Sequence, residues 1–283
     1  MATQANHEQS DGVAAKRDSP AKLWTVNFIL LWQGNLVSAA GDVIYEIALG
    51  FWILAVTGST ALMGTLMAAS TVPRVLLSPL AGVVVDRVDR KWILVAMDAI
   101  RGVAVVLVAV AAMTGHAEVW MVFVAGVVIG LCAAFFTPSV LSVIPDIVAR
   151  ERIVQANSFF SMIHAGSGIL GNALGGLLYA TLGAPVMFLL NGISYLFSSG
   201  TEMFLNVPVS HRTRGRPRFF KDMKEGFRYV WTHAGMRFLM LAAGVINFFA
   251  VIGIMLIIPL FHRTERLGPS RYGVLMAVFT ACM

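Results

Sequence analysis

The sequence predicts an all-α membrane protein that crosses a bilayer several times. Hydrophobic residues make up 58% of the 283-residue chain, against about 45–50% in soluble domains. The mean hydropathy is +0.77. Apolar segments of about twenty residues recur along the chain, and each is long enough to cross a hydrocarbon core of about 30 Å as a helix. The alternation and amphipathic striping of a soluble protein are scarce.

The apolar segments predict seven complete spans and the beginning of an eighth. Residues 1–22 are polar and lack the apolar core of a signal peptide, so we expect a disordered tail before the first span. The eighth span begins near residue 271 and is cut off at Met283. The seven complete spans are residues 24–51, 60–84, 92–113, 119–143, 155–180, 184–206 and 238–261.

The distribution of positive charge predicts the orientation. Three links between spans read TGST, TGHAE and LGAP and contain no Lys or Arg. The tail and the alternate links hold sixteen of the 21 Lys and Arg residues, whereas the link after span 7 holds three. Since Lys and Arg accumulate in cytoplasmic loops, we expect a cytoplasmic N-terminus in a cell membrane. The net charge of +6 then reflects topology, and no nucleic-acid partner is expected.

Residues 207–237 divide the chain into two parts. Before them lie six spans with short links, residues 23–206, which predict a six-helix bundle; after them, residues 238–283 begin a second bundle. Within this basic link, FFKDMKEGFRYVW (residues 219–231) places apolar and charged residues at helical spacing. Such a pattern is typical of a helix at an anionic membrane surface. A flexible tether is the alternative.

Two acidic residues lie inside the first predicted span. Asp42 and Glu46 are four residues apart and therefore share one face of a helix. Ionisable side chains inside a membrane span are costly and usually mark a substrate or ion pathway. We interpret the pair as a site for a proton or a cationic substrate. The alternative for Glu46 is a position in water near the outer mouth of the bundle.

Three more ionisable residues lie in spans 2 and 3. Arg74 precedes Asp86 by twelve residues and Asp98 follows it by twelve, so a hairpin around Asp86 places both at similar depth. Asp98 and Arg101 also share a helix face. We therefore predict a buried cluster of Arg74, Asp98 and Arg101, which either braces the bundle or takes part in transport.

With these residues in view, the chain resembles the major facilitator superfamily. Its motif for the link between spans 2 and 3, G-x-x-x-D-R-x-x-R-[KR], is matched without exception. The similarity extends to SAAGD (38–42), VPRVLLSPLAG (72–82), IPDIV (144–148) and EGFRY (225–229), and is strongest to macrolide-efflux and enterobactin-exporter proteins. The matching residues of the link motif are Gly82, Asp86, Arg87, Arg90 and Lys91.

A second motif supports the exporter branch in part. Exporters carry G-P-x-x-G-G on span 5, and GNALGG here retains Gly171, Gly175 and Gly176 with Asn172 in place of the proline. Small residues four apart, as in Gly171 and Gly175 or in Gly126 and Gly130, let helices approach closely.

The resemblance implies a major facilitator fold of twelve helices in two halves, with the substrate cavity between them. It also implies that Asp86 bridges to the C-terminal half and closes the cytoplasmic side. The chain would then be a C-terminally truncated fragment whose partners are the lipid bilayer, a small-molecule substrate, a coupling proton and the missing half.

The sequence leaves three functions open. The first is proton-coupled efflux of drug-like, amphipathic or siderophore-like molecules, and the second is nutrient import on the same fold. The third is a membrane enzyme or receptor with seven or eight spans. No H-E-x-x-H, G-x-S-x-G, P-loop or metal-spaced His/Cys cluster occurs, so we expect neither an enzyme nor a cofactor or metal.

Overall fold

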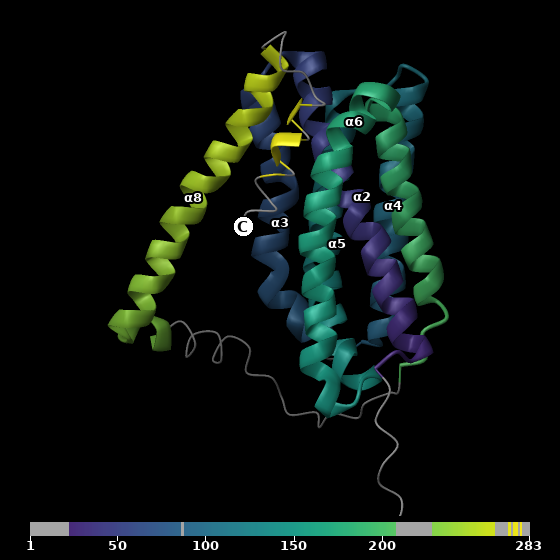
Figure 1. Ribbon diagram of the computed structural model, residues 1–283, viewed down its shortest axis with the longest axis vertical. Helices are drawn as coiled ribbons and strands as arrows, with labels where there is room; N and C mark the ends of the chain where they lie inside the picture. Colours follow the sequence, from purple (N-terminus) through teal and green to yellow (C-terminus); the bar gives the residue numbers. More distant parts are fainter. Residues whose placement is uncertain are drawn as a thin grey trace, which may run out of the picture.

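The computed structural model describes residues 23–85, 88–207, 228–263, 271–272, 274–276 and 278, and every regular element in these ranges is helical (Figure 1). This confirms the predicted all-α class. The elements are α2 (Val26–Thr57), α3 (Thr60–Val85), α4 (Arg90–Met113), α5 (Val119–Ile147), the short 3₁₀ helix η1 (Arg150–Arg152), α6 (Ile153–Glu202) and α8 (Ala234–Arg263).

Six of these helices contain segments long and apolar enough to cross a membrane. They coincide with the predicted spans, although α2 continues past residue 51 to Thr57 and α5 continues past residue 143 to Ile147. The predicted spans 155–180 and 184–206 are the two arms of α6. These arms meet at Gly183, whose φ of 74° and ψ of 170° are not helical, and Figure 1 shows the chain reversing there.

All three links without Lys or Arg turn at a glycine with positive φ. Gly58, Gly115 and Gly183 have φ values of 65°, 76° and 74°. Residues other than glycine rarely adopt this backbone conformation. These turns lie together at what we call the glycine end of the bundle. The opposite end, which we call the basic end, carries residues 88–89, 148–152 and 203–207.

Helix α2 lies closest to α6, while α4 packs on α6 and α5, and α3 packs on α5. Glycines allow the closest of these approaches. A Cβ added at Gly171 would lie 2.6 Å from the Cβ of Val43, and one at Gly175 would lie 2.5 Å from Cδ1 of Ile47. Gly176 is buried in the same helix. The glycine motif of span 5 therefore faces α2.

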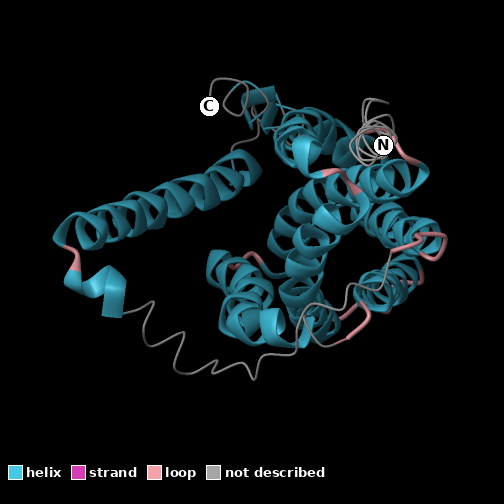
Figure 2. Ribbon diagram, turned by 90° about the horizontal axis from the view of Figure 1, so that it is seen from below, coloured by secondary structure: helices cyan, strands magenta, loops and turns pink. Residues whose placement is uncertain are grey.

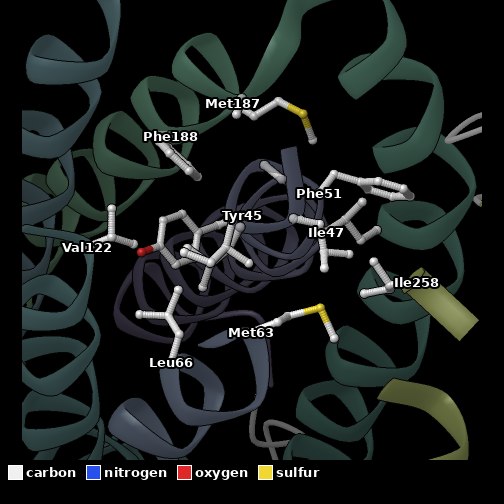
Figure 3. Close-up of a cluster of buried hydrophobic side chains, with 14 of the residues drawn as sticks. Tyr45, Ile47, Phe51, Met63, Leu66, Val122, Met187, Phe188 and Ile258 are labelled. Carbon is white, nitrogen blue, oxygen red and sulfur yellow. The ribbon is translucent and has the colours of Figure 1, made fainter. Parts of the chain in front are cut away.

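Two clusters of buried apolar side chains fill the bundle. One extends toward the glycine end and includes Tyr45, Phe51 and Phe188, which Figure 3 shows together with Met187, Leu66 and Val122. The other lies toward the basic end around Phe28, Leu31 and Phe160. Large apolar residues such as Leu107, Trp120 and Leu141 remain exposed on the outside of the bundle. Exposed apolar surface of this extent is expected where lipid surrounds the helices.

Helix α8 stands apart from the bundle over most of its length (Figures 1 and 2). Its contacts with the bundle lie near its last turns, where Ile258 meets Gly50 and Met63. Tyr272 completes this junction, since its ring packs edge-on against Phe51 at 5.5 Å and lies 5.9 Å from Phe261.

Several predictions fall on parts of the chain outside the described residues. These are the disordered tail at 1–22, most of the link 207–237 with residues 219–227 of its expected helix, and most of the eighth span. Within the link, residues 228–232 are helical. The predicted domain boundaries therefore stay predictions.

The contact between α3 and α5 makes the first testable prediction. A Cβ at Gly130 would lie 2.0 Å from the carbonyl oxygen of Ser70. Because neither backbone can yield without moving its helix, we expect Gly130→Ala to cost about 1–3 kcal/mol of stability, as overpacking does. Thermal unfolding of the complete gene product in detergent measures this.

The matched control is Gly200→Ala, since a Cβ at Gly200 meets no atom within 4 Å. This variant should keep or slightly raise the unfolding temperature, because alanine favours a helix more than glycine does. Equal unfolding temperatures for the two variants would contradict the close α3–α5 contact.

Candidate functional site

A buried ion pair lies at the interface of α4 and α6. Arg101 donates to the carboxylate of Asp98 one turn earlier on α4, and the two residues are 5% and 0% exposed. The guanidinium of Arg101 is also stacked between two aromatic rings, 4.3 Å from the centroid of Phe136 on α5 and 4.5 Å from that of Tyr195 on α6. Three helices thus hold this cation in place.

Tyr195 connects the ion pair to α2. Its ring faces Arg101, and its hydroxyl donates a hydrogen bond to Oδ1 of Asp42. Asp42 is half-buried. The contact depends on close packing, because a Cβ added at the neighbouring Gly41 would lie 2.5 Å from Oδ1 of Asn191 on α6. The sequence placed Asp42 in a pathway but did not predict its partner.

A further carboxylate lies at the other side of the ion pair. Glu202, the last residue of α6, is 0% exposed, and its Oε1 lies 3.5 Å from the hydroxyl oxygen of Ser198. We refer to Asp42, Asp98, Arg101, Tyr195 and Glu202 as the charge network. Glu202 is absent from the site predicted from the sequence, although it lies inside the predicted span 184–206, where an ionisable residue indicates a functional position.

Glu46 faces a cavity of about 290 Å³ between α2, α3, α8 and the segment around Tyr272. One turn separates this residue from Asp42, as predicted from the spacing. The lining is otherwise apolar apart from Tyr272 and consists of Val43, Ile47, Met67, Val251, Ile254, Ile258 and Met276. A carboxylate in such surroundings attracts a cation with apolar parts, because charge pairing and burial of apolar surface then act together.

The predicted cluster of Arg74, Asp98 and Arg101 requires a correction, because the structure pairs Asp98 with Arg101 and leaves Arg74 outside. Arg74 is exposed and lines a separate cavity of about 170 Å³ between α3 and α5, beside Thr137 and Pro138. Its charge acts instead on Asp42 and Glu46. The prediction assumed that helices adjacent in sequence face each other, whereas α3 packs on α5 and α4 packs on α6.

Among the described members of the link motif, Arg90 has a partner on another helix. Arg90 forms an ion pair with Asp146 near the end of α5 and donates to the carbonyl oxygen of Ser142 at 3.3 Å. Lys91 lies 5.7 Å from the ring of Trp92. Asp86 and Arg87 lie outside the described residues.

Gly82 departs from its expected role. The motif predicts a close backbone approach at Gly82, yet a Cβ there meets nothing within 4 Å in the described part of the chain. Asp146 lies in the IPDIV stretch, and no local pattern marks it as a partner of the link motif. Its spacing from the link, 56 residues from Arg90, gave no sign that the two meet.

Comparison with known proteins places this arrangement in a family. Residues 19–282 match the family described as transmembrane secretion effector. The chain belongs to this family of major facilitator transporters. Members are transporters and not enzymes, which agrees with the expectation from the sequence.

Two curated relatives of this family member are efflux proteins. The chain is 26% identical over 239 residues to macrolide efflux protein A of Streptococcus pyogenes, which covers 84% of the chain and 59% of the relative. It is 27% identical over 228 residues to the multidrug efflux pump Tap of Mycobacterium bovis, covering 75% and 52%. The chain therefore spans less than two thirds of the length of these relatives.

A solved structure supports the fold of the transporter. A bacterial homologue of the human lysosomal transporter Spinster, in an inward-facing and unoccupied conformation, superposes with a TM-score of 0.72 at 17% identity. The match covers 91% of the chain and 60% of that structure. The predicted major facilitator fold is confirmed.

The ion pair between Asp98 and Arg101 makes the second prediction. Asp98→Asn leaves a buried guanidinium without its carboxylate, and losing one partner of a buried pair costs about 3–5 kcal/mol. We expect a lower yield of folded transporter in the membrane and a lower unfolding temperature. Both are measured on the complete gene product after detergent extraction.

Asp89→Asn is the control on the same helix. Asp89 is exposed and caps α4 by accepting from the backbone N–H of Lys91 at 3.0 Å, and asparagine caps a helix about as well as aspartate does. This variant should behave as the wild type. Normal yield and stability in Asp98→Asn would show that the pair does not hold the bundle together.

Proposed function

We propose that the chain is part of an exporter that uses a proton gradient to expel amphipathic, drug-like or siderophore-like small molecules by alternating access. The observation that carries the proposal is the position of Glu46, an acidic side chain in a cavity that is otherwise almost entirely apolar. An amphipathic cation matches this lining. The efflux activities named for the relatives support the direction of transport.

The charge network supports coupling to protons. Asp42 lies one helical turn from Glu46 on α2 and accepts a hydrogen bond from Tyr195, so the cavity and the network share one helix. Carboxylates within membrane spans commonly serve as proton relays. In the proposal, proton binding to this network and substrate binding near Glu46 influence each other through α2.

The proposal also assigns a second bundle to the complete transporter. Transporters of this kind place the substrate between two bundles that rock against each other, and the relatives are longer than this chain. In this view α8 and the segment at 271–278 begin the second bundle. The basic end would face the cytoplasm of the cell, as the distribution of Lys and Arg predicts.

In this scheme the motif at the basic end is a gate. The ion pair between Arg90 and Asp146 ties the start of α4 to the end of α5. Asp86 lies four residues before Arg90, and we propose that it bridges to the second bundle and holds the cytoplasmic side closed.

Transport by the complete gene product tests the function. Reconstituted in proteoliposomes with its basic end outside, the protein should concentrate ethidium, an amphipathic cation, and the macrolide erythromycin inside the vesicles. When the vesicle interior is more acidic than the outside, protons should leave the vesicles while substrate enters. A protonophore should abolish this accumulation of substrate. Fluorescence quenching and a radioactive tracer measure the two substrates.

Three other results are informative. Accumulation in the opposite orientation would support an importer, and accumulation that survives the protonophore would reject proton coupling. No movement of either substrate in any orientation, with a protein that is folded by thermal unfolding, would contradict the assignment to amphipathic cations.

The gate makes a separate prediction. Hydrogen bonds to charged groups contribute about 1.5–3 kcal/mol, so Asp86→Asn should lower the transport rate by roughly tenfold or more. Membrane insertion and yield should stay normal, because the residue belongs to the link between the predicted spans 2 and 3 and not to a span. Transport and yield are measured side by side.

Asp89→Asn serves again as the control, since Asp89 lies three residues further along the same link, at a variable position of the motif. It should transport at the wild-type rate. If Asp86→Asn also transports normally, the gate is wrong.

A further inference from the structure

Glu202 is the feature of the bundle that the proposed function leaves unexplained. It ends α6 at the basic end of the bundle, and its side chain is completely buried. It lies beside the ion pair of Asp98 and Arg101, with which it interacts electrostatically. A buried carboxylate is costly unless a cation or hydrogen-bond donors compensate its charge.

The charges around Glu202 do not balance when every group is ionised. The described groups that face this region are Asp98 and Arg101 from α4 and Tyr195 from α6, with Asp42 from α2 and Cys132 from α5 acting through Arg101. Arg101 is the one cation among them and is already paired with Asp98. Residues 26–41 of α2, which include Gly34 in contact with Ser198, contain no charged residue.

The two carboxylates, Asp98 and Glu202, also have too few hydrogen-bond donors. The hydroxyl oxygen of Ser198 lies 3.5 Å from Oε1 of Glu202, and this hydroxyl also acts electrostatically on Asp98. It has one proton and can donate to one carboxylate at a time. Oε2 of Glu202 and Oδ2 of Asp98 are buried and have no hydrogen-bond partner. Two ionised carboxylates therefore share a single neutral donor and a single guanidinium.

One added proton balances the excess negative charge and supplies one more hydrogen-bond donor. We propose that Glu202 binds a proton and exchanges it with Asp98 through the hydroxyl of Ser198. A protonated Glu202 donates to Oγ of Ser198, and the Ser198 hydroxyl then donates to Asp98, which keeps its ion pair with Arg101. The group of Asp98, Arg101 and Glu202 is then neutral.

The exchange is a balanced transfer of protons. Glu202 passes its proton to Oγ of Ser198 while the Ser198 hydroxyl passes its own to Asp98, so that Glu202 becomes ionised and Asp98 neutral. Arg101 then loses its nearest anion. It remains between Phe136 and Tyr195, and its charge is then shared between the ionised Glu202 and Asp42, with both of which it interacts. The proton transfer at the basic end thereby changes the electrostatic environment of Asp42 in the middle of α2.

The segment that follows α6, with Leu205 and Asn206, covers Glu202 at the basic end. The chain after α6 folds back so that Leu205 is 1% exposed. Asn206 is tied to the start of α2 by two hydrogen bonds with Asn27, of 2.8 Å and 3.0 Å. Opening of this segment would give the Glu202 proton a route to water, which is the step that proton release requires. The role in coupling rests on the proposed function, whereas the proton site itself does not.

Infrared spectroscopy of the complete gene product tests the site directly. A protonated, buried carboxyl group has a carbonyl stretching band separate from that of carboxylates. We expect this band in the wild type at neutral pH and its loss in Glu202→Gln. Glu202→Asp should shift the band without deleting it, which assigns the band even if Glu202→Gln does not fold. Glu151→Gln, which changes an exposed carboxylate on η1, should leave the band of the protonated carboxyl group unchanged.

Transport variants test the exchange. Ser198→Ala keeps Glu202 and its band but removes the relay, so accumulation of ethidium driven by a pH gradient should be lost, while exchange of labelled for unlabelled ethidium without a gradient should persist. Glu202→Gln should show the same loss. Gradient-driven accumulation at the wild-type rate in both variants would overturn the relay.

The outcomes separate this inference from the proposed function. A wild-type spectrum without the band, or a band unaffected by both changes at Glu202, overturns the proton site whatever the transport assays give. A band that Glu202→Gln removes, in a protein that moves no ethidium, supports the site and contradicts the proposed substrate class.

Discussion

The close contact of α2 with both arms of α6 is the constraint on which the candidate site depends. Lipid tails are as apolar as the helix surfaces, so helices in a membrane associate through tight packing and polar contacts more than through the hydrophobic effect. Gly171 and Gly175 let the first arm meet Val43 and Ile47, and Gly41 lets the second arm meet α2 at Asn191. This approach brings Tyr195 to Asp42, and through Tyr195 connects α2 to Arg101 on α4. A wider spacing would separate the hydroxyl of Tyr195 from Asp42 and break the connection from α2 to Arg101.

The architecture could be predicted because it follows from composition. Long apolar segments indicate the helices, and links with and without Lys or Arg indicate their two ends. The family motif extends the prediction to the fold. The neighbours of each helix could not be predicted in this way. Spans 2 and 3 are consecutive and joined by a short link, yet α3 packs on α5 and α4 on α6. This is why Arg74 was assigned to Asp98 and why Asp146 was not recognised as the partner of Arg90.

The candidate site was predicted in its residue types and only partly in its connections. Asp98 and Arg101 are one turn apart, and helical spacing alone brings them together. The link from Asp42 to Tyr195 joins residues 153 positions apart, which no local pattern indicates. Glu202 was overlooked because it stands near the predicted end of a span, where a charged side chain is usually in water. The return of the chain over Leu205 buries it instead.

The turn at Gly183 has a mechanical consequence. The two arms of α6 are joined through a single non-helical residue, so no slack separates them. One arm carries the glycines that touch α2, and the other carries Tyr195, Ser198 and Glu202. A tilt of one arm is therefore transmitted to the other, and we expect the two arms to move together. A displacement of α2 at Val43 and Ile47 would thus move the first arm and, through the turn, shift Glu202 at the end of the second arm.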